Sequence, residues 1–101
     1  MLGREAGPRP RLDFGRATSS ADRFRDTAID LEETTAAGYI GQSASLTTPA
    51  VQDAASIVAV EARHAAWIRD LAGADPAPRA ADPGKAPEAI LSDLRRKGFL
   101  R

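Results

Sequence analysis

The sequence predicts an all-α protein with an antiparallel two-helix hairpin and a short C-terminal helix. Apolar residues make up 43% of the 101 residues, but only 5% are aromatic, and many of the rest are alanine, which suits close-packed helices better than strands. Two long stretches carry apolar residues at spacings of three and four, the period of a helix with one buried face. Glycine and proline separate these stretches and mark their ends.

The N-terminal residues 1–19 predict an irregular arm, because glycine and proline interrupt any helical period there. Ser19 or Ser20 is a suitable N-cap for a first helix over 21–45. Gly38 and Gly41 lie inside this helix and predict the close approach of another helix. The apolar face of the helix is spaced four, three, four and four residues apart, at Phe24, Ala28, Leu31, Thr35 and Tyr39.

A second helix is predicted over 49–71, with Thr48 as its cap, Pro49 at its first position and Gly73 after its end. The short connection makes the two long helices antiparallel neighbours. The prolines of residues 74–87 predict an extended segment, followed by a short helix over 87–97. Phe99 and Leu100 then predict an apolar clip onto the bundle. The chain thus divides into an arm (1–19), a helix pair (20–73) and a proline-rich segment with a short helix (74–101).

Composition excludes several classes of function. The chain has no cysteine, which rules out disulfides and thiolate metal sites. Its 14 basic and 14 acidic residues cancel, so there is no global field to attract nucleic acid or an anionic membrane. No apolar run approaches the roughly 20 residues of a membrane span, and residues 1–10 lack the features of a secretory signal. We therefore expect a cytoplasmic protein.

The second helix places a carboxylate and an imidazole on its inner stripe. Glu61 and His64 lie three residues apart on one face and can reach one cation between helices. Burial of an ionised carboxylate without a partner costs several kcal/mol. Glu61 and His64 therefore need a charged or hydrogen-bonding partner at this position. The stripe is spaced three, four, three, four and three, at Ala54, Ile57, Glu61, His64, Ile68 and Leu71.

The first helix supplies a candidate third ligand. Glu32 lies 15 residues before a turn centred near residue 47, and Glu61 lies 14 after it, so the two carboxylates should face each other at one level. Carboxylates with one imidazole suit iron or manganese. Glu32, Glu61 and His64 are therefore candidate metal ligands. The alternative is that Glu61 pairs with Arg63 or Arg69, that His64 is a core histidine, and that no metal is bound.

Both long helices resemble those of a known family, the desiccation-related proteins of the ferritin-like type. Residues 31–41 (LEETTAAGYIG) resemble its third helix and residues 54–69 (AASIVAVEARHAAWIR) its fourth. Looser similarities extend the match over residues 13–100, at Asp13-Phe14-Gly15, Ser19, Ser20, Phe24, Asp75-Pro76, Asp82-Pro83 and Phe99-Leu100.

The resemblance implies half of a ferritin-like four-helix bundle, in which Glu32, Glu61 and His64 correspond to metal ligands. Tyr39 corresponds to a tyrosine packed beside the site, in its second shell. The first two helices of the family, which supply the remaining Glu and the other Glu-x-x-His, have no counterpart here. Many family members are exported, and this chain shows no signal.

Three accounts of the half-bundle remain: a homodimer with six ligands, a chain that complements another helix pair, or a truncated fragment of a longer domain. In each, Ile57, Ile68 and Leu71 stay exposed on the lone chain, and Trp67 is expected to pack at an interface. The resemblance implies a stress- or desiccation-related structural or metal-binding module as the expected function. Alternatives are a homodimeric di-iron oxidoreductase of ferroxidase or peroxidase type and a helix-in-groove interaction module.

Overall fold

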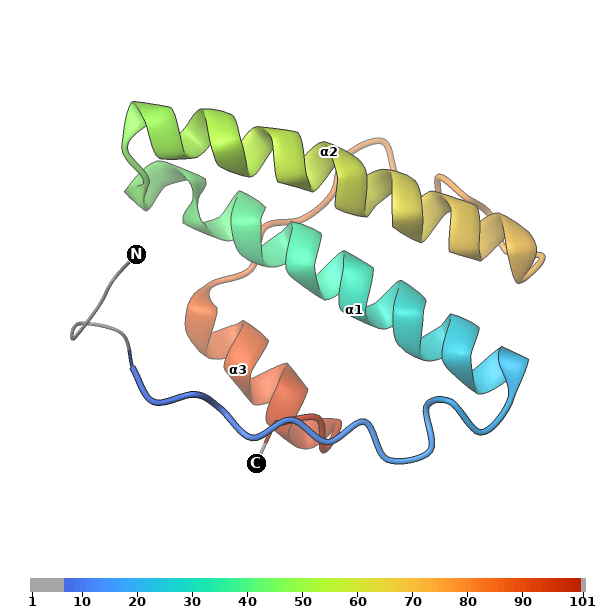
Figure 1. The fold of residues 1–101 in the computed structure, drawn as a ribbon. Coiled ribbons are helices and arrows are strands. Elements are labelled where there is room, and N and C mark those ends of the chain that lie inside the picture. The colour runs from blue at the N-terminus through green and yellow to red at the C-terminus, as the bar shows by residue number, and fades with distance from the viewer. Residues whose placement is uncertain (1–6, 101) are drawn as a thin grey trace.

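The computed structural model describes residues 7–100 and shows three α-helices (Figure 1). Helix α1 spans Ala21–Gln42 and passes through a short 3-10 turn, η2 (Ser43–Ser45), into helix α2 (Thr48–Leu71). The two long helices run antiparallel side by side, and helix α3 (Pro87–Arg96) packs against α1 (Figure 1). The structure confirms the predicted all-α class, with a hairpin and a short third helix.

The helix ends follow local capping chemistry. The Ser20 hydroxyl accepts a hydrogen bond from the Arg23 amide at 3.2 Å and caps α1. Gly73 (φ 72°) and Gly98 (φ 77°) follow α2 and α3 in the left-handed conformation that glycine adopts without strain. The predicted cap of α2 was wrong by one residue, because Thr47 is extended and precedes a helix that already includes Thr48.

The most buried side chains are small. They let the helix backbones approach closely, but they remove little apolar surface from water. No large side chain in the described part of the chain is fully buried. The hairpin core therefore joins two helices without covering the larger apolar residues around it. The residues below 10% exposure are Thr34, Ala36, Ala37, Ala54 and Ala65.

The proline segment, residues 74–86, returns across the face of the hairpin that is turned away in Figure 1. It is attached where the Lys85 amide donates a hydrogen bond to the Ala37 carbonyl at 2.9 Å. The segment leads directly into α3, whose Ile90 side chain lies beside Gly38 of α1. Helix α3 is therefore the neighbour of Gly38, but only at ordinary van der Waals distance, whereas the close approach is at Gly41, which contacts the proline segment.

The C-terminal apolar pair contacts the N-terminal arm and the end of α3. Phe99 packs its ring against Phe14, with centroids 5.6 Å apart, and its carbonyl accepts a hydrogen bond from the Asp13 amide. Leu100 forms an isolated antiparallel bridge with Leu12. The predicted clip therefore ties the arm to the end of α3. Within residues 7–100, no helix combines the length and apolar content needed to cross a membrane.

Candidate metal centre

The three predicted ligands meet between the two long helices. Glu32 lies near the middle of α1, and Glu61 and His64 lie one turn apart near the middle of α2. His64 Nδ1 is 3.4 Å from Glu32 Oε1 and 3.9 Å from Glu61 Oε2. One ligand atom from each residue lies within 4.8 Å of the others. Antiparallel packing of level-matched helices produces this cluster, as the chain spacing predicts.

The Glu32 carboxyl group of this cluster holds its proton more tightly than a glutamate in water. Burial raises the pKa of Glu32, and a hydrogen bond with Glu61 and the negative charge of Glu61 raise it further. His64 acts in the opposite direction, through its charge and a hydrogen bond, but does not cancel these effects. A hydrogen bond between two carboxyl groups requires a proton on one of them. The surroundings of Glu32 therefore disfavour its negative charge unless a positive charge lies nearby.

The geometry fits a divalent cation. Metal–ligand bonds of about 2.1 Å place neighbouring ligand atoms roughly 3 to 4 Å apart. The two distances from His64 Nδ1 to the glutamate oxygens fall in this range. About a quarter of each glutamate side chain and half of the His64 side chain are exposed, which leaves one side of the cluster open. Three ligands from one chain leave coordination positions free on that side.

Tyr39 lies two turns along α1 from Glu32, half-buried. Among the described residues, its hydroxyl makes no hydrogen bond to Glu32, Glu61 or His64. Tyr39 instead lines an apolar groove of about 780 Å³ that runs from the hairpin to α3. Its predicted role in the second shell remains a prediction.

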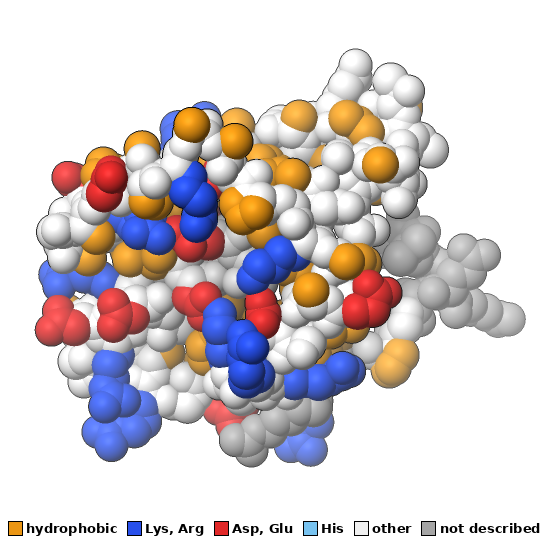
Figure 2. Space-filling model, turned by 180° about the vertical axis from the view of Figure 1, so that it is seen from behind, with side chains coloured by type: hydrophobic (Ala, Val, Ile, Leu, Met, Phe, Trp, Pro, Cys, Tyr) orange, Lys and Arg blue, Asp and Glu red, His pale blue; other side chains and the backbone are white. Residues whose placement is uncertain are grey.

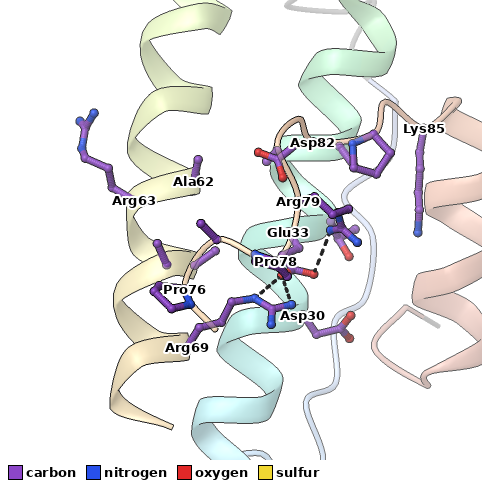
Figure 3. A pocket seen from close by; sticks show the side chains of 17 residues that line it. Asp30, Glu33, Ala62, Arg63, Arg69, Pro76, Pro78, Arg79, Asp82 and Lys85 are labelled. Atoms are coloured by element: carbon purple, nitrogen blue, oxygen red, sulfur yellow. Dashed lines mark hydrogen bonds and ion pairs between the residues drawn. The ribbon is translucent and has the colours of Figure 1, made fainter. Parts of the chain in front are cut away.

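A separate charged cluster occupies the opposite side of the hairpin, under the proline segment (Figure 3). The Arg69 Nε donates to Glu33 Oε1 at 2.7 Å, and its Nη2 donates to the same oxygen. Arg79 of the proline segment lies 4.0 Å from the other Glu33 oxygen. Arg69 is therefore committed to Glu33, which removes it as the alternative partner of Glu61.

The groove was not predicted from the sequence, because it depends on where α3 docks. Leu91 and Leu94 of α3 line one side, and Leu31 and Ile57 of the hairpin line the other. The amphipathic pattern of residues 87–97 was the available signal, but a helix of ten residues can dock on several apolar faces.

We expect Glu32→Gln to stabilise the metal-free protein at pH 7 by up to about 1 kcal/mol. The raised pKa of Glu32 means that the folded state binds its proton more tightly than the unfolded state. The stabilisation from Glu32 is fully present only below its unfolded pKa, about 4.3, and is lost as the pH rises through the folded pKa. Glutamine imitates the protonated side chain at every pH.

Urea unfolding of both proteins at pH 7 and pH 4, with a chelator present, measures this difference. The advantage of Glu32→Gln should shrink at pH 4. If Glu32→Gln is instead less stable than the wild type at pH 7, then the ionised Glu32 carboxylate does not destabilise the folded protein. Excess Mn²⁺ should reverse the order at pH 7, because only the wild-type protein keeps all three ligands.

Comparison with known proteins gives a family for this arrangement. A sequence model of the ferritin-like domain matches residues 1–74, which contain the arm, the hairpin and all three candidate ligands, but not α3. Comparisons with curated proteins and with solved structures gave no significant match. The matched range covers well over half of the 101 residues, and its helices form the expected antiparallel pair. The chain belongs to the ferritin-like domain family.

Proposed function

We propose that this chain is a metal-binding module of the desiccation-related, ferritin-like type, and that Glu32, Glu61 and His64 hold iron or manganese. The observation that supports the proposal is the convergence of two carboxylates and one imidazole from two helices within 4.8 Å. Two negative charges balance a divalent cation, and the mixed oxygen and nitrogen donors suit these metals. The desiccation-related role rests on the similarity of residues 31–41 and 54–69 to that family's helices.

The residues have separate tasks in this proposal. Glu32 joins α1 to the site, so a bound ion would link the two helices and stabilise the hairpin. Glu61 and His64 form the pair that holds the ion from α2. A carboxyl group must lose its proton before it binds a metal ion, and the pKa of Glu32 is raised, so binding should strengthen as the pH rises through that pKa. A bound iron or manganese ion would supply either a structural link or one-electron redox chemistry.

Oxidation of Fe(II) as a substrate, with O₂ or a peroxide as electron acceptor, is the second candidate function. The exposure of His64 favours it, because a small oxidant can reach the open side of the cluster. Loss of O₂-dependent Fe(II) oxidation in a combined Glu61→Ala, His64→Ala variant would support turnover. A wild-type rate equal to that of the variant would leave a binding or scaffold role.

Metal titration tests the proposed binding site. We expect the wild-type chain to bind about one Mn²⁺ per chain, and Glu61→Gln and His64→Ala each to weaken binding at least tenfold. Asp53→Asn is the matched control, because Asp53 is an exposed carboxylate of the same helix, outside the cluster. Calorimetry and elemental analysis of the gel-filtered protein give affinity and stoichiometry. Equal affinity in the wild type and Glu61→Gln would refute the assignment.

A further inference from the structure

An exposed apolar stripe runs along α2 beside the metal cluster. Its members are spaced three, four, three and four residues apart, the pattern that a partner helix normally buries. The four apolar members are 37% to 66% exposed, and half of the His64 side chain is exposed at the centre. We call these residues the open stripe: Ile57, Val60, His64, Trp67 and Leu71.

The open stripe shares only Ile57, His64 and Leu71 with the stripe that the sequence predicted. Ala54, Glu61 and Ile68 turn towards α1 and are buried or half-buried, whereas Ile57 and Leu71 remain outside. Val60 and Trp67 join the exposed side. Covering them requires another layer of helices, which residues 7–100 of a single chain do not supply.

The open stripe is complementary to itself. Ile57 and Leu71 lie seven residues on either side of His64, and Val60 and Trp67 lie four before and three after it. If two copies of α2 pack antiparallel about a two-fold axis near His64, Ile57 of each copy meets Leu71 of the other. The large Trp67 then meets the smaller Val60. A two-fold interface requires this kind of self-complementary surface.

The same two-fold axis would complete the proposed metal site. Glu32 lies eleven residues after the start of α1 and ten before its end, so a two-fold axis at this level lets the long helices overlap over most of their length. One chain offers three ligands, whereas a di-metal carboxylate site in a four-helix bundle takes about six. A second copy of the chain would supply the other three from the open side.

We propose that two copies of this chain dock antiparallel through the open stripe and share a metal centre to which each contributes Glu32, Glu61 and His64. This inference rests on the proposed metal site, and it identifies a second copy of the chain as the source of the remaining ligands. Without metal, the interface would bring four glutamates together, and their repulsion opposes docking. Two divalent cations neutralise these charges. Metal binding and dimerisation are therefore coupled, and each strengthens the other.

The opposite face of the molecule is less suited to a dimer interface than the open stripe. Acidic and basic side chains intermingle there, over the proline segment and the hairpin (Figure 2). By contrast, among residues 7–100 only Asp53 and Lys85 are charged and line the apolar groove next to the open stripe, and the Lys85 Nζ donates a hydrogen bond to Asp93 at 2.7 Å. Desolvation of the open stripe therefore costs less than desolvation of the charged face.

Sedimentation equilibrium of the full chain with and without Mn²⁺ tests the proposal. We expect the mass to double from 10.7 kDa when Mn²⁺ is in excess, with about two ions per dimer. Trp67 is the only tryptophan, so its emission should shift to the blue as the dimer forms. Trp67→Glu should remain monomeric and bind Mn²⁺ at least tenfold more weakly, although it keeps all three ligands.

Ala55→Glu is the matched control, because it introduces the same side chain at an exposed position of α2 that is not three or four residues from any member of the open stripe and therefore lies on another face. It should dimerise like the wild type, and circular dichroism should show that both variants fold. A wild-type chain that binds one Mn²⁺ and stays at 10.7 kDa would overturn the dimer but keep the proposed site. A dimer that forms equally well in Trp67→Glu would overturn the interface. A chain that binds no Mn²⁺ would refute the proposed function, and the dimer with it.

Discussion

Gly41→Ala is expected to destabilise the folded protein by about 2 to 3 kcal/mol, despite the higher helix propensity of alanine. A Cβ atom at residue 41 would lie 2.6 Å from the Lys85 carbonyl carbon and 2.8 Å from its nitrogen. These are backbone atoms, which cannot rotate away as a side chain could. The proline segment would have to leave α1 and lose the hydrogen bond from Lys85 to Ala37. Because α3 follows at Pro87, its docking should weaken too.

Gly38→Ala is the control for this substitution, in the same helix and three residues away. A Cβ atom there would lie 3.9 Å from the Ile90 side chain, which is ordinary van der Waals contact. We expect Gly38→Ala to stabilise the protein by about 0.5 to 1 kcal/mol through helix propensity. Urea denaturation followed by circular dichroism measures both. Equal effects at the two positions would show that the proline segment does not press on Gly41.

Glu33→Gln is expected to cost about 1.5 to 3 kcal/mol, because it leaves the Arg69 guanidinium without its anionic partner. The Arg69 side chain is only 21% exposed, so water replaces the lost carboxylate poorly. The substitution also removes the attraction for Arg79, which helps to hold the proline segment over the hairpin (Figure 3).

The surface pair of Arg25 and Asp22 provides the comparison. It joins side chains that are 38% and 88% exposed, three residues apart on one helix. Arg25→Gln should cost less than about 0.5 kcal/mol. A thermal unfolding series with Glu33→Gln, Arg69→Met and the double variant would give the coupling energy of the partly buried pair. A coupling energy near zero would contradict its proposed role.

The sequence predicted the helices closely because their signals are local. Ser20, Gly73 and Gly98 mark helix ends through the conformations of single residues, and the three-and-four spacing marks the inner faces. The candidate metal cluster followed from the same periodicity. Once two helices of known length are joined by a short turn, the level at which Glu32 meets Glu61 is fixed by counting residues. That these residues bind metal remains a prediction.

Contacts between distant segments could not be predicted in this way. Glu33 and Arg69 are 36 residues apart, and nothing in their local pattern distinguishes this pairing from one between Arg69 and Glu61. Gly41 was expected to face a helix, but it contacts the extended backbone at Lys85. The contact of Phe99 with Phe14 joins the two ends of the described chain. Each of these contacts depends on the path of the chain between the two residues, which local sequence patterns do not specify.

The sequence by itself determined the helical hairpin and the side chains that can meet on its inner face, because helix period and loop length are properties of the local chain. Only the tertiary structure decided which half of the α2 stripe is buried. Helix α1 packs against α2 at the small residues Ala54 and Ala65, which are buried. The other side of α2 stays exposed, with Ile57, Val60, His64, Trp67 and Leu71. The rotation of a helix against its neighbour depends on side-chain volumes at the contact, which periodicity alone does not specify.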